Sequence, residues 1–373
     1  MTAPRTWDIF CAVIDNYGDI GVCWRLARQL AAEYQLTVRL WGDDLASLQR
    51  LCPEVLPALD RQTCRGVEIR RWDKLFPAVE PAEAVIEAFA CELPANYVAA
   101  MAAQSLKPVW INLEYLSAEG WVVGCHGGVS KHPALPLTKH FFFPGFAPGT
   151  GGLLREAGLG QGFAAGAWWA GHGFSLPQPD EVRISLFGYE NAAVHGLLDT
   201  WAASATPITC LLPEGRLLPQ VSAWAGPGLL HPGDCITRGN LAVHVLPFLE
   251  QDDYDRLLQA CDINFVRGED SFVRAQWAAK PFVWHIYPQQ DDAHQPKLEA
   301  FLELYCAGLS APAAGALRGF WRAWNSGVNT GEAWPDWWRQ RAELERHARG
   351  WKAALAAQQD LAARLVNFCK NKI

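Results

Sequence analysis

Two acidic residues, Asp15 and Asp19, stand four positions apart in segment 14–21, which reads IDNYGDIG. Gly18 and Gly21 permit a tight turn and a close approach of the backbone to a ligand. Because carboxylates repel phosphate, the segment favours binding of a cation or transfer of a proton over binding of a phosphate. The structural alternative is that one of these acids caps the N-terminus of the following helix.

A second polar segment, 265–271, reads FVRGEDS between a predicted strand and a predicted helix. A strand, a glycine-containing turn and a helix N-terminus together make an anion site from backbone N–H groups. Arg267 is suited to clamping a pyrophosphate, Ser271 offers a hydroxyl donor, and Glu269 is suited to accepting hydrogen bonds from ribose hydroxyls. The alternative is that Glu269, Asp270 and Ser271 only cap the helix.

Aromatic residues stand at the ends of predicted strands in the second half of the chain. Phe187 and Tyr189 end one strand, and Phe248, followed by Gln251, ends another. Because the carboxyl ends of parallel strands share one rim of a sheet, these rings are able to bracket a planar base, with amide hydrogen bonds from Gln251. Taken alone, the alternative that the rings are ordinary core residues is favoured.

These segments are set within a regular alternation of apolar, strand-like runs and helical patterns. One series spans 7–143 and another 182–287, so we predict two α/β domains, each with a doubly wound parallel sheet. A Gly- and Pro-rich stretch, 144–179, separates them, and we predict domains 1–178 and 179–350. Two Rossmann-like domains facing across a cleft describe the GT-B glycosyltransferase fold, but also several epimerases and binding proteins.

The composition narrows the classes of partner. The chain has 373 residues and a net charge of −7 without a long basic run, so we expect no nucleic-acid partner. The 11 Cys residues are dispersed without a CxxC pair, which is typical of core residues in a reducing compartment. The N-terminus lacks the pattern of a signal peptide, and no apolar run approaches the ~20 residues that span a bilayer. We therefore expect a cytoplasmic protein without membrane attachment.

The sequence resembles a known family at both polar segments. DNYGDIG at 15–21, with WRLAR at 24–28, is similar to the N-terminal signature of the EarP family of bacterial protein-arginine rhamnosyltransferases, and RGEDS at 267–271 is similar to its second signature. The stretch 287–294, YPQQDDAH, resembles the loop that closes a nucleotide-sugar site in many GT-B enzymes. The resemblance covers essentially the whole chain. It implies a GT-B fold in which the C-terminal helix, 351–373, returns to the first domain.

The resemblance also implies a reaction. L-Rhamnose would pass from dTDP-β-L-rhamnose to one arginine of translation elongation factor P, with inversion, without a metal and without a cofactor beyond the donor. The general-base role falls to Asp19 with support from Asp15, and Glu269 joins them as a catalytic candidate. The nucleotide-sugar-binding candidates are Asn16, Tyr17, Gly18, Phe187, Tyr189, Phe248, Gln251, Tyr254, Arg267, Glu269, Asp270, Ser271 and Tyr287. Tyr254 stands where the family has Phe, and we predict that it forms a wall of the thymine site.

The residues are themselves compatible with this chemistry. A guanidinium has a pKa above about 12 and is a weak nucleophile, but a carboxylate can orient it, localise its charge and accept a proton as the C–N bond forms. The Asp-x-Asp pair of Asp253 and Asp255 opens a predicted helix, where acids are ordinary first-turn charges. Two alternatives stay open: a nucleotide-sugar epimerase of the same fold, which needs no protein acceptor, and a non-catalytic nucleotide-sugar-binding module.

Overall fold

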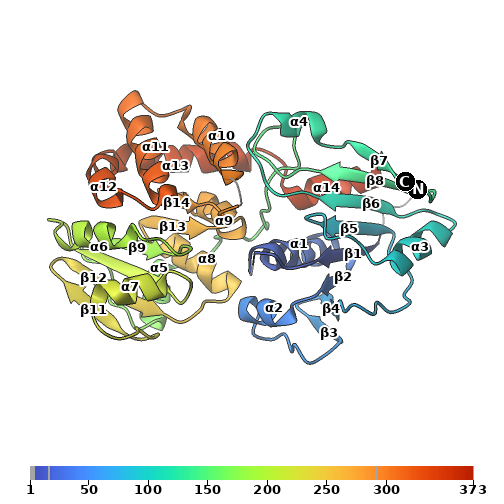
Figure 1. Cartoon of the computed structure of the whole chain (residues 1–373), viewed down its shortest axis with the longest axis horizontal. Coiled ribbons are helices and arrows are strands. Elements are labelled where there is room, and N and C mark those ends of the chain that lie inside the picture. The colour runs from blue at the N-terminus through green and yellow to red at the C-terminus, as the bar shows by residue number, and fades with distance from the viewer. Residues whose placement is uncertain (1–4, 16, 290–291, 373) are drawn as a thin grey trace. The chain divides into compact units, whose positions relative to one another are not determined.

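The chain divides into two compact units, and each is described here by itself (Figure 1). Unit 1 consists of residues 1–159 and 356–373, and unit 2 of residues 160–355. Each unit contains a largely parallel sheet with helices packed against it. The computed structural model describes residues 5–15, 17–289 and 292–372.

Unit 1 is built on a sheet with the strand order β3-β4-β2-β1-β5-β6-β8-β7. The strands are β1 (Thr6–Cys11), β2 (Thr37–Gly42), β3 (Arg61–Cys64), β4 (Val67–Arg71), β5 (Ala84–Ala88), β6 (Val109–Leu113), β7 (Val129–Lys131) and β8 (Thr138–Phe142). The helices are α1 (Gly18–Tyr34), α2 (Leu45–Leu51), α3 (Ala95–Ala103), α4 (Trp121–Cys125) and α14 (Leu361–Lys370). The two edge pairs, β3–β4 and β7–β8, are antiparallel, and the pairs between them are parallel.

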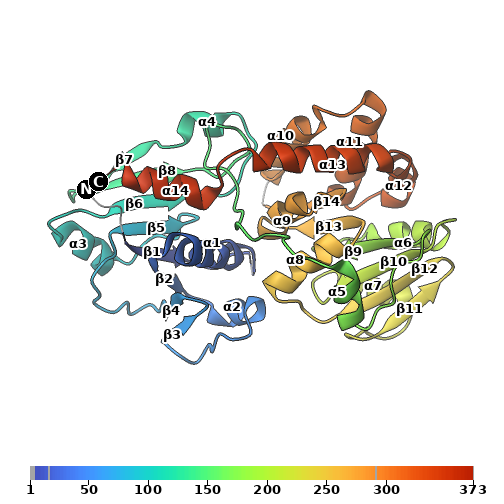
Figure 2. The same ribbon diagram turned by 180° about the vertical axis from the view of Figure 1, so that it is seen from behind.

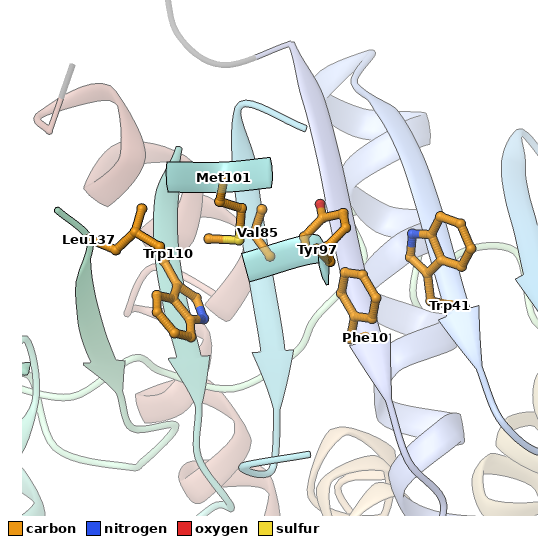
Figure 3. Packing of buried hydrophobic residues seen from close by; sticks show 7 residues of the cluster. All are labelled: Phe10, Trp41, Val85, Tyr97, Met101, Trp110 and Leu137. Carbon is orange, nitrogen blue, oxygen red and sulfur yellow. The ribbon is translucent and has the colours of Figure 1, made fainter. Parts of the chain in front are cut away.

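An aromatic core covers one face of this sheet (Figure 3). The Phe10 ring of β1 lies 5.7 Å from the Trp41 ring of β2 and 4.8 Å from the Tyr97 ring of α3, measured between centroids. The buried Asp8 carboxylate accepts hydrogen bonds from Nε and Nη2 of Arg39, each at 2.6 Å, and also from the Trp41 indole and the Tyr97 hydroxyl. A buried carboxylate needs such partners. The network therefore ties β1 to β2 and to α3. It holds the strand from which the loop carrying Asp15 begins.

The C-terminal helix α14 lies against α1 within unit 1 (Figure 2). Asp360 caps α14 by accepting a hydrogen bond of 3.0 Å from the backbone nitrogen of Ala363, and Gln29 of α1 donates to the same carboxylate at 3.2 Å. Arg155 donates to the carbonyl of Ala356 at 2.7 Å. These contacts attach the end of the chain to the unit in which it began.

Unit 2 contains a second sheet, with the order β11-β12-β10-β9-β13-β14. Its strands are β9 (Val182–Leu186), β10 (Ile208–Pro213), β11 (Cys235–Arg238), β12 (Leu241–Leu246), β13 (Ile263–Arg267) and β14 (Phe282–His285). Its helices are α5 (Ala165–Gly171), α6 (Val194–Ala202), α7 (Leu218–Ala225), α8 (Gln251–Ala260), α9 (Asp270–Ala278), α10 (Gln295–Cys306), α11 (Ala311–Ser326), α12 (Thr330–Arg339) and α13 (Arg341–Ala356). Only β11 runs antiparallel to its neighbour.

Unit 2 begins earlier in the chain than the predicted junction after residue 178. The reason is helix α5, whose Trp168 and Trp169 pack into a core cluster with Leu211 of β10 and Leu257 of α8. At the other end, the Trp351 indole of α13 donates to the side chain of Gln276 at 2.8 Å. This contact keeps α13 with unit 2 beyond the predicted limit at residue 350.

Three local features differ from the sequence-based expectations. The helical pattern of the sequence predicts a helix over 22–33, but α1 begins at Gly18, so Asp19 lies in the first helical turn and not in a loop. Proline suits a first helical turn, which predicts that position for Pro335, but Pro335 lies inside α12. The short edge strands β3 and β7 were not expected from the sequence. Among the helices of the described residues, none is long and apolar enough to cross a membrane.

Candidate active site

The acidic segment after β1 is organised by Asp19. This side chain is 2% exposed, and its Oδ2 atom accepts hydrogen bonds from the backbone nitrogens of Ile14 at 2.8 Å and Asp15 at 2.9 Å. Tyr17 occupies the N-cap position of α1 and makes no capping bond with its side chain. Asp19 therefore turns back onto the preceding loop, while its charge lies where the helix dipole favours an anion.

Asp15 lies against the start of the same helix. The Gly18 nitrogen donates to the Asp15 carbonyl at 2.6 Å, and a Cβ atom at Gly18 would lie only 2.8 Å from Oδ2 of Asp15. A glycine at position 18 is therefore what allows the carboxylate to pack here. Asn16, a predicted sugar-binding residue, lies outside the described residues. Asp15, Tyr17, Gly18 and Asp19 lie together where the chain enters α1.

The topology of unit 1 determines where this turn lies. Strand β1 lies between β2 on one side and β5 on the other. The strand order therefore runs outward in opposite directions from the boundary between β1 and β5, which is the topological switch point of the sheet. In open α/β sheets, ligands bind at such a switch point, outside the carboxyl ends of the strands. The loop that follows β1 and carries Asp15 and Asp19 lies at this position.

The predicted anion site of unit 2 has the expected strand–turn–helix form. Between β13 and α9, Gly268 adopts φ +61°, a conformation that favours glycine. The Ser271 hydroxyl accepts a hydrogen bond of 3.0 Å from the backbone nitrogen of Arg267 and donates to its carbonyl, while the Trp284 indole donates to the Gly268 carbonyl at 2.7 Å. The Ser271 hydroxyl therefore shapes the turn. Glu269 is the N-cap residue of α9 but makes no capping bond with its side chain.

The Arg267 side chain is held between two aromatic rings. Its guanidinium carbon lies 4.7 Å from the ring centroids of both Phe187 and Tyr189. The side chain is buried, and its Nε atom finds no hydrogen-bond acceptor within the part of the chain that the structure describes. A buried cationic donor without an acceptor is costly unless a ligand supplies one, and a phosphate oxygen is a suitable acceptor.

Two further predicted nucleotide-binding residues, Tyr254 and Tyr287, contact the two rings that lie beside this arginine. Strand β9 pairs with both β10 and β13, so the switch point of this sheet lies between the loops that follow β9 and β13. The Tyr254 ring lies 5.5 Å from Phe187, and the Tyr287 ring lies 5.5 Å from Tyr189. Burial raises the pKa of the Tyr254 phenol, which therefore stays neutral. These aromatic rings and Arg267 form one group of contacts at the carboxyl ends of β9 and β13.

Two further predicted residues lie on α8 and just before it. Gln251 is buried at the start of α8, and its Nε2 atom donates to the Asp270 carboxylate of α9 at 2.9 Å. Phe248 is half-buried in the connection between β12 and α8. Both residues therefore lie at the carboxyl edge of the sheet. The amide nitrogen of Gln251 is already used in its hydrogen bond to Asp270.

His285 supports this site and was not identified from the sequence. Its Nδ1 atom accepts a hydrogen bond of 3.3 Å from the backbone nitrogen of Tyr189. Burial, followed by the neighbouring Arg267 charge, lowers the pKa of the His285 imidazole to about 3, so the ring is neutral near pH 7. The only signal in the sequence was a polar residue inside an apolar run that ends a strand, 282–287.

The Asp-x-Asp pair is engaged in structural contacts. The two oxygens of Asp253 contact the Trp168 indole at 2.7 Å and Nε2 of His172 at 2.8 Å. Asp255 accepts two hydrogen bonds from Arg274, at 3.0 and 2.7 Å, which join α8 to α9. The described residues do contain one group with ligand atoms close enough for a metal, namely Cys52, Glu54 and Cys64, located between α2 and β3.

Comparison with known proteins identifies the family. Residues 7–370 match the model described as elongation factor P (EF-P) rhamnosyltransferase EarP. This chain belongs to the EarP family. Protein-arginine rhamnosyltransferases of Pseudomonas putida and Pseudomonas aeruginosa are 53% and 50% identical to it, covering 99% and 97% of the chain and 99% and 98% of the relatives. The activity class that the two signatures implied is thereby confirmed.

Solved structures with the same fold were found for this EarP family chain. A structure described as the basis for EarP-mediated arginine glycosylation of translation elongation factor EF-P is 41% identical, with a TM-score of 0.69 and 99% coverage of both chains. A kitacinnamycin glycotransferase matches at 13% identity, with a TM-score of 0.54 and full coverage of both chains, and supports the fold alone. The predicted GT-B α/β fold is therefore confirmed.

Proposed function

We propose that this chain transfers L-rhamnose from dTDP-β-L-rhamnose to an arginine side chain of translation elongation factor P, with inversion at the anomeric carbon. Family membership supports the transfer of rhamnose to an arginine. The acceptor proposal follows the description of the family and of the related structure, both of which refer to EF-P. The choice of dTDP as the nucleotide rests on the residue-by-residue resemblance to the family.

The donor is proposed to bind in unit 2. The base would stack among Phe187, Phe248 and Tyr254, because these aromatic side chains gather at the carboxyl edge of the second sheet. The diphosphate would accept hydrogen bonds from Arg267 and from the N-terminus of α9, whose dipole favours an anion. Asp270 and Ser271 begin this helix, and Glu269 is suited to the ribose or rhamnose hydroxyls.

The acceptor chemistry is proposed to centre on Asp19. A guanidinium nitrogen attacks C1 of rhamnose, and the C1–O bond to the diphosphate breaks with its electron pair leaving on dTDP. The guanidinium proton passes to the Asp19 carboxylate, which acts as general base. Positive charge from Arg267 and the helix N-terminus stabilises the departing dTDP. Asp15 assists by adding negative charge beside the guanidinium.

The observation that carries the proposal is the buried Asp19 carboxylate at the switch point of unit 1. The test is incubation with dTDP-rhamnose in the presence and in the absence of elongation factor P. Donor turnover that requires the acceptor supports the transferase. Change of the sugar without acceptor would support an epimerase, and donor binding without any turnover would support a binding module.

We also propose that the reaction needs no metal and takes place in the cytoplasm. Arg267 and the backbone donors of α9 are able to take the electrostatic role of a metal at the diphosphate. A translation factor as acceptor favours a cytoplasmic enzyme. We expect neither a nucleic-acid partner nor membrane attachment, since the net charge is −7 and the basic residues do not form a long run.

A further inference from the structure

The turn that follows β5 has an unusual backbone. Phe89, Ala90 and Glu92 have φ values of +56°, +53° and +53°, although none of them is glycine. Left-handed backbone costs of order 1 kcal/mol or more for each such residue, and it persists only where the surrounding structure holds it. Residues of this kind cluster at binding and catalytic sites.

Specific contacts hold this turn in place. The Phe89 nitrogen donates to the Leu113 carbonyl at 2.7 Å, and the Ala90 nitrogen donates to Oδ1 of Asn112 at 3.1 Å. The Cys91 thiol contacts the carbonyl of Phe10 at 3.4 Å. The turn is therefore tied to β6 on one side and to β1 on the other.

The turn contacts a segment after β6 that carries a tyrosine and a glutamate in succession. The Phe89 ring stacks on the Tyr115 ring, with 4.4 Å between the centroids and 17° between the planes. Tyr115 is half-buried just after β6, and the neighbouring Glu114 side chain, also half-buried, accepts a hydrogen bond from Asn112. A planar aromatic surface and a carboxylate are the two groups that recognise a guanidinium, by stacking and by charge-assisted hydrogen bonds.

The position of this turn relates it to Asp19. The switch point of unit 1 lies between β1 and β5, so the loop that carries Asp19 and the turn that begins at Phe89 follow adjacent strands at the same edge of the sheet. We therefore expect a ligand of this unit to bind between the loop and the turn. The proposed mechanism uses only the loop, which carries Asp19.

We infer that Tyr115, stacked on Phe89, and Glu114 position the acceptor arginine for attack, an inference that rests on the proposed function. The aromatic pair supports the plane of the guanidinium. Glu114 accepts hydrogen bonds from guanidinium nitrogens that do not face Asp19. The strained turn fixes the position of the Phe89 ring. The Tyr115 ring stacks on it, so the turn also fixes the orientation of Tyr115.

The experiment compares Tyr115→Leu with Tyr115→Phe, which keeps the stack, and with Glu114→Gln, which keeps the shape of the side chain. Steady-state rates give KM for elongation factor P and for dTDP-rhamnose, and thermal melting monitors folding. An elongation factor P whose target arginine is changed to alanine serves as a competitive inhibitor, because it retains every contact except those of the guanidinium.

We expect Tyr115→Leu to raise KM for the acceptor by about 3–30-fold, the range for a lost cation–π contact, while Tyr115→Phe stays near the parent. Glu114→Gln should also raise KM for the acceptor. KM for dTDP-rhamnose should stay unchanged in Tyr115→Leu, Tyr115→Phe and Glu114→Gln. The inhibition constant of the alanine acceptor should stay unchanged, because that protein lacks the guanidinium.

The following results would overturn the inference. An unchanged acceptor KM in both Tyr115→Leu and Glu114→Gln would remove these residues from recognition. A parallel rise in the inhibition constant would show that they bind another part of the acceptor protein, and a parallel rise in donor KM or a fall in melting temperature would indicate a structural role. If the parent enzyme leaves elongation factor P unmodified, the proposed function itself fails, and this inference fails with it.

Discussion

The Oδ2 atom of Asp19 lies 2.9 Å from the backbone nitrogen of Asp15, so one candidate acid holds the backbone of the other. The same oxygen accepts from Ile14, at 2.8 Å. Asp19 therefore has a structural task besides its proposed chemical one. The two tasks differ in what they require: the backbone bonds need an acceptor oxygen, whereas proton transfer needs a charged carboxylate.

Substitutions at Asp19 separate these tasks. Asp19→Asn keeps an oxygen that can accept both backbone hydrogen bonds but removes the negative charge and the proton-accepting group. We expect a loss of about 10²–10⁴-fold in kcat, with donor affinity and melting temperature close to the parent. Rates of rhamnosylation and dTDP-rhamnose binding should be measured on the same folded sample.

Asp19→Ala is the matched variant, since it removes the charge and the acceptor oxygen together. We expect the same loss of kcat and, in addition, a loss of about 1–3 kcal/mol in the free energy of unfolding, because two backbone N–H groups lose their partner. Near-normal turnover of Asp19→Asn would exclude Asp19 as the base. If Asp19→Asn and Asp19→Ala lower the free energy of unfolding equally, the loss of kcat would be assigned to a structural role of Asp19.

Removal of Arg267 should weaken donor binding. Its Nε atom is buried and has no acceptor among the described residues, and a donor phosphate is suited to supply one. We expect dTDP affinity to fall by about 1–3 kcal/mol, with a similar fall for Phe248→Ala. Titration calorimetry with dTDP measures both, and unchanged affinity in both variants would contradict the proposed donor site.

His285 should make the protein less stable as the pH falls. Its pKa is about 3 in the folded protein, whereas an unfolded histidine has a pKa near 6.5, so the unfolded chain takes up the proton first. The contribution of His285 is therefore complete above about pH 6.5 and is lost progressively toward pH 3, by at most about 1.4 kcal/mol per pH unit.

The matched variant is His285→Asn, which keeps an acceptor near the backbone nitrogen of Tyr189 but does not titrate. Urea unfolding of both proteins between pH 5 and 8 compares their slopes. We expect the parent to lose stability more steeply than His285→Asn below about pH 6.5. Equal slopes for the two proteins would show that His285 does not control this dependence.

Chelation should leave activity unchanged, because the carboxylates of the Asp-x-Asp pair are used in structural bonds. Asp253 contacts Trp168 and His172, so Asp253→Ala should lower the free energy of unfolding by about 1–3 kcal/mol, with kcat retained at a temperature where the variant is folded. Activity that is abolished by EDTA and restored by Mg²⁺ would return this pair to the mechanism.

The regular elements were the most predictable part of the fold. The sequence predicts a helix over 45–51 and a strand over 109–113, and helix α2 and strand β6 have these ends, because apolar periodicity and a buried parallel strand leave clear patterns. Strand β7 is exposed along its whole length and gives no such pattern. The predicted start of α1 at residue 22 is too late, because the glycines at 18 and 21 conceal a helical turn, in which Asp19 accepts hydrogen bonds from the preceding loop.

The candidate site was predictable where its chemistry lies in short segments. Asp19 and Arg267 stood out because a charged side chain next to glycine, between a strand and a helix, has few structural explanations. His285 could not be found in this way, since its role depends on β14 and the loop after β9 meeting through the sheet. The pairing of Phe89 with Tyr115 likewise arises only from the adjacency of β5 and β6.

The decisive measurement is the intact mass of elongation factor P after reaction with this enzyme and dTDP-rhamnose. We expect one added deoxyhexose, located on one arginine by fragmentation, and none when Asp19→Asn replaces the parent enzyme. An unchanged mass of elongation factor P while the parent enzyme consumes the donor, or a sugar attached to a side chain other than arginine, would contradict it.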